Sequence, residues 1–396
     1  MSNTQKVQAV ILVFAVSMVA CQKDEVDTTV PVPENNGPLS LPDTPYDYST
    51  VVLPAHLTTN VLQGPGQNAA IDNDNTPASN PITDHGATLG RVLFYDRSLS
   101  ANGTISCASC HKQEFGFSDD AMVSVGFDGG LTRRHSMSLV NARWYGRGRF
   151  FWDERAATLE QQVLMPFQDP VEMGMTLDGL VAAVENRDFY PQLFHQAFGS
   201  SEITSERIAL ALAQFVRSIV SVQSRYDIGR AQVAQPTQDF PNLTVSENNG
   251  KLLFFRPVQL GGGGCIGCHS TEAFINPDNG PTNNGLDATS TDDLGVFEAI
   301  PNQAFLGTFK VPSLKDIELT APYMHDGRFA TLEEVVDHYN SGIQPHPNLG
   351  DALQGPDGLP IQLNLTSQEK ADLVAFLKTL TDEVLTNDVR FSDPFN

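Results

Sequence analysis

The chain has few basic residues, few cysteines and no apolar run long enough to span a bilayer. Its 24 Lys and Arg stand against 47 Asp and Glu, which gives a formal charge of −23 at pH 7. This charge excludes a general nucleic-acid binder, because phosphate would be repelled, and any docking partner is expected to be basic or neutral. With 396 residues, 40% of them hydrophobic, the chain is long enough for two or three globular domains. The five cysteines are an odd number, so each thiol needs an assigned use.

The N-terminus has the pattern of an export signal. Lys6 precedes an apolar run over 9–19, which is too short to cross a bilayer as a mature helix but suits a secretory signal. Small and apolar residues stand directly ahead of Cys21, and this resembles the bacterial lipobox, in which the cysteine is lipidated. We expect a lipoprotein signal peptide over 1–20 and a lipid anchor on Cys21. The alternative is a plain signal peptide with an incidental cysteine.

Residues 21–80 are rich in Pro, Asn, Asp, Thr and Gly and show little periodicity. We expect them to form a flexible tether that lifts the folded part off a membrane. Export and the lipid anchor predict a periplasmic location. Gln22 after Cys21, in place of an acidic residue, favours the outer membrane over the inner one.

The other four cysteines form two C-x-x-C-H motifs, at 107–111 and 265–269. Two thiols at i and i+3 reach the two vinyl groups of one porphyrin and the adjacent histidine ligates the iron, so each motif predicts a covalently bound haem c. A zinc or redox C-x-x-C site is the alternative, but a zinc site needs further ligands and no cysteine is left. The predicted attachment and iron-binding residues are Cys107, Cys110 and His111 for the first haem and Cys265, Cys268 and His269 for the second.

The chain repeats itself around these motifs. The segment 90–95 precedes the first motif as 250–255 precedes the second, at an offset of 160 residues, and 212–219 is echoed by 373–380 at an offset of 161. The two later segments have apolar residues at i, i+3, i+4 and i+7, which predicts amphipathic helices. We therefore predict an all-α protein, mainly helical with long loops, built as two tandem cytochrome-c-like haem domains. The expected ranges are 81–240 for the first domain and 241–396 for the second.

Three further segments carry a family resemblance. They are FWDERAATLE at 151–160, DPVEMG at 169–174 and LTAPYMHDG at 319–327. In this order around two C-x-x-C-H motifs, they are similar to segments of the bacterial diheme cytochrome c peroxidase and MauG superfamily, and the resemblance covers about residues 85–380. It implies an enzyme in which one haem reacts with hydrogen peroxide while the other stores or relays an electron. The implied electron donor is a small cytochrome c or cupredoxin, and the implied alternative is a protein substrate.

The resemblance assigns three residues to the reaction. Trp152 matches the tryptophan between the haems, where an indole can carry charge, and its plainer role is to fill the domain interface. Glu172 matches the acid of the peroxide pocket, which accepts and returns a proton during O–O cleavage, unless it only caps a turn after Pro170. Gln162 matches a glutamine that orients peroxide or water, unless it faces solvent. Trp144 lies outside these motifs and is expected to pack in the core or on the surface.

The loop after the first motif indicates the MauG-like branch. In typical peroxidases a histidine of this loop ligates the first iron in the resting form, whereas this chain has Phe127 in that place. Pro166 matches a proline of MauG, with a short turn as its plainer interpretation. We therefore expect the first iron to be five-coordinate or water-bound, and open to peroxide without reductive activation.

A calcium ion between the domains is a further implication of the resemblance. Thr320 and Pro322 match the positions whose backbone carbonyls complete the calcium site, and carbonyl oxygens suit a hard cation. His135 stands where the family usually has an asparagine near that ion, which weakens the expectation. We interpret His135 as a hydrogen-bonded interface residue. A supporting group behind the metal ligands and a stand-in ligand for the first iron are the alternatives.

The second haem is expected to have Tyr339 as its other ligand. Thr331 and Glu334 form a capping box that opens a helix, and an apolar stripe beginning at Leu332 brings Tyr339 to the inward face. Typical peroxidases have methionine at this position, and MauG has tyrosine. A hard phenolate favours the ferric iron, whereas a thioether favours the ferrous iron. Core packing of Tyr339, and ligation by Met324 in its place, are the alternatives.

These features together predict a membrane-tethered diheme c-type peroxidase of the MauG-like branch. Peroxide is expected to react at the first haem, Glu172 to manage its protons and Trp152 to pass charge to the second haem. One alternative is a MauG-like enzyme that uses peroxide to oxidise side chains of a partner protein. Another is a non-enzymatic diheme electron-transfer cytochrome, because fold and cofactor alone do not determine function.

Overall fold

The computed structural model describes residues 39–59, 69–276 and 280–395. They belong to one compact unit, Glu34–Asn396. The expected signal peptide over 1–20 and the lipidation site at Cys21 lie outside the described residues.

Helices and long loops make up the described residues, which contain isolated bridges but no β-strand. The all-α class is therefore confirmed. None of the helices in these ranges is long and apolar enough to cross a membrane. The α-helices are α1 (Ala55–Thr58), α2 (Asp84–Tyr95), α3 (Cys107–Cys110), α4 (Leu159–Gln162), α5 (Met165–Gln168), α6 (Leu177–Glu185), α7 (Tyr190–Phe198), α8 (Ser205–Ser218), α9 (Arg225–Arg230), α10 (Val245–Phe255), α11 (Leu332–Asp337), α12 (Ser367–Lys378) and α13 (Glu383–Thr386).

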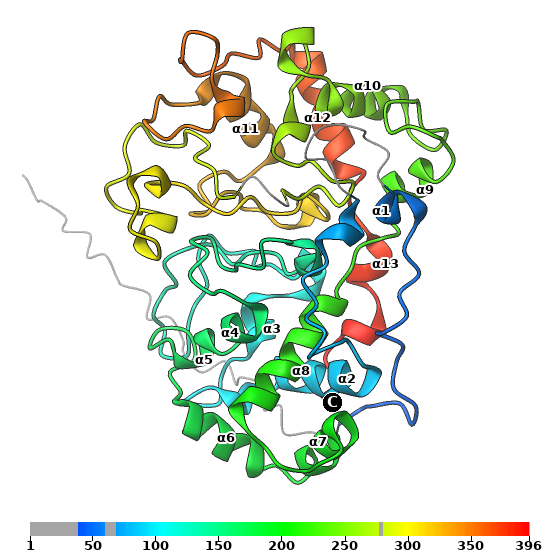
Figure 1. The fold of residues 1–396 in the computed structure, drawn as a ribbon, viewed down its shortest axis with the longest axis vertical. Coiled ribbons are helices and arrows are strands. Elements are labelled where there is room, and N and C mark those ends of the chain that lie inside the picture. The colour runs from blue at the N-terminus through cyan, green and yellow to red at the C-terminus, as the bar shows by residue number, and fades with distance from the viewer. Residues whose placement is uncertain (1–38, 60–68, 277–279, 396) are drawn as a thin grey trace, which may run out of the picture. The chain divides into compact units, whose positions relative to one another are not determined.

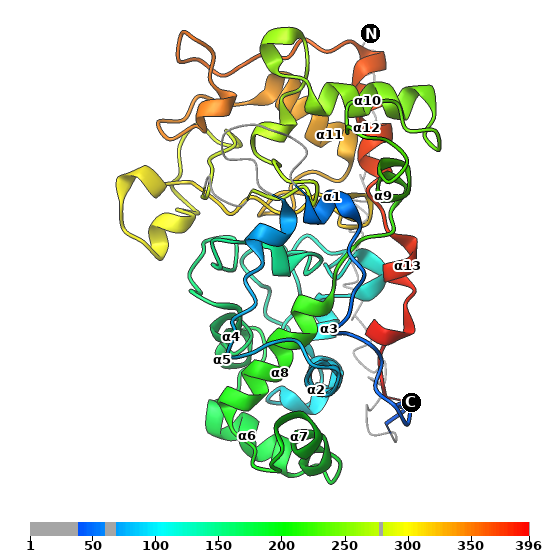
Figure 2. The same cartoon turned by 45° about the vertical axis from the view of Figure 1, so that its right-hand side comes forward.

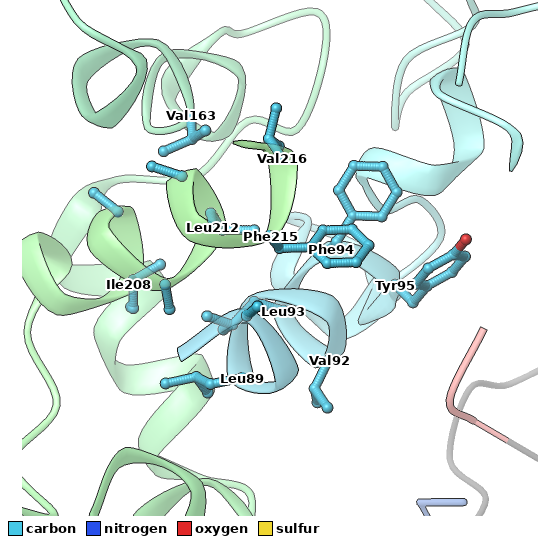
Figure 3. Packing of buried hydrophobic residues seen from close by; sticks show 14 of the residues in the cluster. Leu89, Val92, Leu93, Phe94, Tyr95, Val163, Ile208, Leu212, Phe215 and Val216 are labelled. Carbon is cyan, nitrogen blue, oxygen red and sulfur yellow. The ribbon is translucent and has the colours of Figure 1, made fainter. Parts of the chain in front are cut away.

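The first of two helix crossings pairs α2 with α8 (Figure 1). Each helix follows a threonine, Thr83 or Thr204, whose side chain accepts a hydrogen bond from the first turn. Apolar faces of the two helices meet in a buried core, where the ring centroids of Phe94 and Phe215 are 5.2 Å apart (Figure 3). Because α2 leads into α3, this crossing positions the first C-x-x-C-H motif.

The second crossing pairs α10 with α12 and repeats this arrangement (Figure 2). Thr244 and Thr366 open these helices with capping boxes. Phe254 of α10 lies against Phe376 of α12, with ring centroids 5.4 Å apart. The repeat seen in the sequence therefore corresponds to two equivalent helix pairs.

A glycine marks the closest approach in each crossing. A Cβ at Gly90 would lie 2.1 Å from the carbonyl oxygen of Ala211, and a Cβ at Gly250 would lie 1.8 Å from that of Asp372. Any side chain at these positions would push the backbones apart, because packed helices leave no free volume there. These two glycines are the first residues of the repeated segments.

The buried apolar residues form two main cores. The first contains residues between 87 and 219, joined by Leu385 and Phe391 from near the C-terminus. The second contains residues between 226 and 380. The two cores therefore separate between residues 219 and 226, earlier than the expected boundary at 240. The reason is that Tyr226 and the loop after α9 pack on the aromatic side chains of the second core.

Part of the expected tether belongs to the folded body. Tyr48 is only 1% exposed and joins the first core. Leu57 packs in a third, smaller cluster with Trp144, which is fully buried, in agreement with its expected packing role. The prediction of a flexible tether is therefore wrong for residues 39–59 and 69–80. Tyr48, Leu57 and Ala70 are buried against the rest of the chain, which composition did not reveal.

Gly90→Ala is expected to destabilise the protein by about 1–3 kcal/mol, because the added methyl group forces α2 away from α8. Thermal unfolding of the haem-loaded protein, followed by circular dichroism, measures this as a lowered Tm. Gly179→Ala in α6 is the matched control, since the nearest atom there is the Thr176 hydroxyl oxygen at 3.1 Å. That change should alter stability by less than about 1 kcal/mol. An unaltered Tm for Gly90→Ala would contradict the close crossing.

Candidate functional site

Two cavities lie beside the two C-x-x-C-H motifs. The first has a volume of about 500 Å³ and the second about 210 Å³. The first crossing contributes Phe94 and Leu212 to the wall of the first cavity, and the second contributes Phe254 and Leu373 to the wall of the second. The motif residues in these walls are Cys107, Cys110 and His111 in the first cavity and Cys265, Cys268 and His269 in the second.

A single helical turn presents the thiols of each motif. In the first motif this turn is α3, and the N–H of Ser106 donates to Ser109 Oγ at 3.0 Å at its start. In the second it is a 3₁₀ turn, Cys265–Gly267. All four thiols are free of disulfides. Burial raises the pKa of Cys107 and that of Cys265 to about 12, so both are neutral thiols at the cavity wall.

A backbone carbonyl fixes the imidazole of each motif. His111 Nδ1 lies 3.0 Å from the carbonyl oxygen of Phe117, and His269 Nδ1 lies 3.2 Å from that of Phe274. Since a carbonyl only accepts, Nδ1 carries the proton and Nε2 keeps a lone pair for a metal. Burial lowers the pKa of His111, and it lowers the pKa of His269 to about 4, so both rings are neutral. Paired free thiols, a neutral imidazole and an apolar wall fit a covalently attached haem in each cavity.

Trp152 lies in the wall of both cavities. Its indole N–H donates to the carbonyl oxygen of His135 at 2.8 Å, and its own carbonyl accepts the backbone N–H of Lys310 at 2.8 Å. The ring meets that of His325 edge-on, with centroids 6.5 Å apart. Segments of both halves therefore hold the indole between the two cavities.

Glu172 lines the first cavity, and its carboxyl group has no hydrogen-bond partner among the described residues. Burial, reinforced by the charge of Asp169, raises the pKa of Glu172 to about 7. A carboxyl group with a pKa near neutrality can both accept and donate a proton. The turn after Pro170 is capped by Asp169, whose carboxylate accepts the N–H of Val171 at 2.8 Å. Glu172 is therefore not the capping residue.

Gln162 and Pro166 also line the first cavity. Gln162 ends α4 and Pro166 lies in the first turn of α5, so two short helices bring them to the same cavity as Glu172. Phe127, which replaces the loop histidine, is not in the lining. Its N–H donates to the carbonyl oxygen of Glu172 at 3.0 Å, and its ring packs on Gly174, where a Cβ would lie 2.4 Å from a ring carbon.

Tyr339 and Met324 both line the second cavity. The nitrogen of the Asn284 amide lies 3.4 Å from the Tyr339 hydroxyl oxygen and 3.4 Å from the Met324 sulfur. The predicted helix α11 begins after its Thr331 cap, and a π-helical turn at His338–Gly342 then carries Tyr339. Burial raises the pKa of Tyr339 to about 12. Both candidate ligands therefore occupy the same region, and the choice of Tyr339 stays a prediction.

The contacts of His135 do not fit the expected calcium site. His135 Nδ1 lies 3.0 Å from the Ala121 carbonyl oxygen and Nε2 lies 3.1 Å from Ser118 Oγ. The imidazole also faces the carbonyl of Thr320, which was expected to hold calcium together with that of Pro322. The imidazole therefore competes with a cation for the lone pairs of that carbonyl. In the ranges that the structure covers, no three His, Cys, Asp or Glu residues gather as a metal site. His135 is thus a hydrogen-bonded interface residue, as we interpreted it.

Comparison with known proteins identifies the family. The model of the di-haem cytochrome c peroxidase family matches residues 84–233. The chain is 35% identical over 308 residues to the methylamine utilization protein MauG of Methylorubrum extorquens, which covers 78% of this chain and 81% of that protein. The chain belongs to the di-haem cytochrome c peroxidase and MauG family.

Two further similarities extend over most of this family member. It is 33% identical over 312 residues to the cytochrome c551 peroxidase of Nitrosomonas europaea, covering 75% of this chain and 80% of the relative. The crystal structure of a MauG-like protein associated with microbial copper homeostasis is similar with a TM-score of 0.70 and 38% identity, covering 82% of this chain and 97% of that one. This di-haem family member is therefore an oxidoreductase that uses peroxide, and the family implies two c-type haems.

Two features of the site were not predicted from the sequence. The first is the pair of carbonyls, of Phe117 and Phe274, that fix the motif histidines. A signal was present, because a phenylalanine follows each histidine by six or five residues. The second is Lys310, which lines both cavities. No local pattern marks Lys310, since its burial depends on segments far apart in the chain.

Removal of calcium is expected to leave the stability of the protein unchanged. Incubation of the haem-loaded protein with EGTA, and later addition of Ca²⁺, should not shift Tm, because only a ligand of the native state raises it. His135→Ala should instead cost about 1–3 kcal/mol, since it leaves the Ala121 carbonyl without its donor. His195→Ala, at an exposed position of α7, is the control. A rise in Tm on addition of Ca²⁺ to the wild type would show that a calcium site exists.

Proposed function

We propose that this chain is a di-haem peroxidase of the MauG-like branch, which reduces hydrogen peroxide in the first cavity with electrons that arrive through Trp152 and the second cavity. The observation that carries the proposal is Glu172, an unpartnered carboxyl group in the first cavity with a pKa of about 7. An acid of this kind is required where a proton must leave one oxygen and return to another.

The overall reaction converts hydrogen peroxide, two electrons and two protons into two molecules of water. Cys107, Cys110 and His111 would hold a haem c in the first cavity, and its iron would supply the redox chemistry that peroxide reduction needs. Glu172 would accept a proton from one oxygen of the peroxide and donate it to the other, which then leaves as water. The Gln162 amide donates a hydrogen bond that orients the peroxide. Phe127 packs on Gly174 outside the cavity lining, so this loop position would provide no iron ligand.

Trp152 is assigned the transfer of charge between the cavities. Its position in both walls supports this role, as do the hydrogen bonds that hold it to His135 and Lys310. An indole on this path divides one long electron transfer into two shorter ones. The electron donor that fits this scheme is a small cytochrome c or cupredoxin with a neutral or basic surface, since the chain carries a formal charge of −23.

A second candidate function is the oxidation of side chains of a partner protein. Tyr339 in the second cavity favours it, because a hard oxygen ligand stabilises oxidised iron better than a thioether does. Two oxidising equivalents from one peroxide would then be held in the protein until the partner binds. The third alternative, a non-enzymatic electron carrier, is not supported, because relatives of this chain are named as peroxidases.

We also propose that the protein faces the periplasm and is anchored by a lipid on Cys21, at the outer membrane. The support for this is the apolar run over 9–19 directly ahead of the cysteine. Attachment of haem to C-x-x-C-H motifs outside the bacterial cytoplasm agrees with export.

Glu172→Gln tests the proposed reaction. It is expected to lower kcat/KM for peroxide by about 10²–10⁴-fold, because the proton acceptor is lost. In the wild type, kcat/KM should fall as the pH drops below about 7, since the raised pKa of Glu172 leaves the carboxyl protonated there. The variant should lose this dependence. Steady-state oxidation of a reduced cytochrome c by peroxide measures both effects.

The same assay separates the alternatives. Glu185→Gln, an exposed carboxyl group at the end of α6, should retain the wild-type rate and pH profile. Trp152→Phe should slow oxidation of the cytochrome while the pH dependence assigned to Glu172 remains. Wild-type turnover in Glu172→Gln would refute the proposal. If the wild type reacts with peroxide but oxidises neither a small cytochrome c nor a cupredoxin, the partner-protein function would be favoured.

Cys21→Ser tests the anchor. The wild type, expressed with its N-terminus, should incorporate an alkyne-labelled fatty acid and sediment with the outer membrane. The variant should incorporate no label and stay in the soluble periplasmic fraction, because a hydroxyl group is not lipidated by this pathway. Unlabelled wild type would leave the plain signal peptide as the correct interpretation.

A further inference from the structure

The two cavities share a buried lysine. Lys310 lines both of them, as Trp152 does, and it is only 6% exposed. Its backbone N–H donates to the Trp152 carbonyl at 2.8 Å. Lys310 is therefore fixed beside the residue that separates the cavities, and the proposed reaction assigns it no role.

The ammonium group of Lys310 has no carboxylate partner among the described residues. Nζ donates to the Arg149 carbonyl oxygen at 2.9 Å and lies 3.4 Å from the ring centroid of Tyr145 and 4.4 Å from that of Phe150. One carbonyl and two aromatic faces leave N–H donors of this group without an acceptor. Burial lowers the pKa of Lys310 to about 7, and only the more distant charge of Glu154 opposes this.

Two other buried lysines show how the chain satisfies such a charge elsewhere. Lys315 Nζ lies 2.5 Å from the carboxylate of Asp227. Lys251 Nζ donates to two backbone carbonyls, at 2.7 and 2.6 Å. Neither lysine lines the two cavities. Lys310 differs from both lysines because it faces a cavity, and its Nζ has a single oxygen acceptor, whereas Lys251 has two carbonyls and Lys315 has a carboxylate.

The ammonium group lies on the side of the first cavity. The aromatic rings closest to Nζ, those of Tyr145 and Phe150, line the first cavity and not the second. An anion that completes the contacts of Lys310 must therefore belong to the group that occupies the first cavity. A c-type haem carries two propionate carboxylates, which are anions of this kind.

We propose that Lys310 binds a propionate carboxylate of the first haem and thereby fixes that haem against the segment that holds Trp152. The ion pair compensates a charge that is otherwise costly to bury. Because the Lys310 N–H donates to the Trp152 carbonyl, the contact would place the haem relative to the segment that holds the indole. Lys310 is thus a positioning residue. The inference rests on the first haem itself and is independent of peroxide turnover.

Potentiometric titration of the haem-loaded protein, followed by absorption spectra and without peroxide, tests this inference. Lys310→Met removes a positive charge beside the first haem, and since reduction adds negative charge, the midpoint potential of that haem should fall. Its propionate bending band in the resonance Raman spectrum should also shift. Lys310→Arg keeps the charge and should retain most of the wild-type potential. Lys251→Met changes a buried lysine outside the lining of both cavities, so it is the matched control and should leave the first-haem potential unchanged.

Two results for the Lys310 variants would overturn the inference. An unchanged first-haem potential and Raman band in Lys310→Met would overturn the inference, as would a change confined to the second haem. If Lys310→Met does not accumulate with both haems, Lys310→Gln is measured in the same way. It keeps an N–H donor but loses the charge, so its first-haem potential should fall as well, and an unchanged value would overturn the inference. Because no peroxide is present, these outcomes are distinct from failure of the Glu172 scheme.

Discussion

Each half of the protein depends on one hydrogen bond, from the motif imidazole to a backbone carbonyl a few residues later. The bonds run from His111 to Phe117 and from His269 to Phe274. They fix the tautomer, so that Nε2 is the nitrogen left to bind iron. Both phenylalanines have a left-handed backbone, with φ of 57° and 54°, and both are fully buried. The packing of the two crossings therefore sustains the conformation that aims each carbonyl at its histidine.

Both halves have this imidazole–carbonyl hydrogen bond, but different polar side chains line the two cavities. The first cavity receives Glu172, whose burial raises its pKa to about 7. The second receives Tyr339 and Met324, both close to the amide of Asn284. One repeated fold thus surrounds one cavity with a buried, unpartnered carboxyl group and the other with a hydroxyl and a thioether, the two candidate ligands. The difference comes from loops and short helices outside the repeated pairs.

Trp152 and Lys310 connect these sites through the backbone as well as through the cavity walls. Their peptide groups are hydrogen-bonded, and the indole N–H reaches across to His135. Nearby, Arg134 of the first half pairs with Asp293 of the second at 2.7 Å, with little exposure of the arginine. Partly buried charge pairs and main-chain bonds of this kind define one relative placement of the two cavity walls. The proposed transfer of charge through Trp152 depends on such a fixed placement.

The sequence alone determined the features that depend on local spacing. The paired thiols beside a histidine, the threonine cap before α11 and the amphipathic helices over 212–219 and 373–380 were all predicted, because short-range geometry specifies them. Tertiary structure decided the rest. The buried Tyr48 donates its hydroxyl hydrogen to the carbonyl of Arg390, 342 residues away. Composition cannot reveal such a contact, and it wrongly indicated a flexible tether here. Lys310 is buried between the cavities only because its segment packs on that of Arg149, about 160 residues away. Burial by a distant segment produces no pattern in the neighbouring sequence.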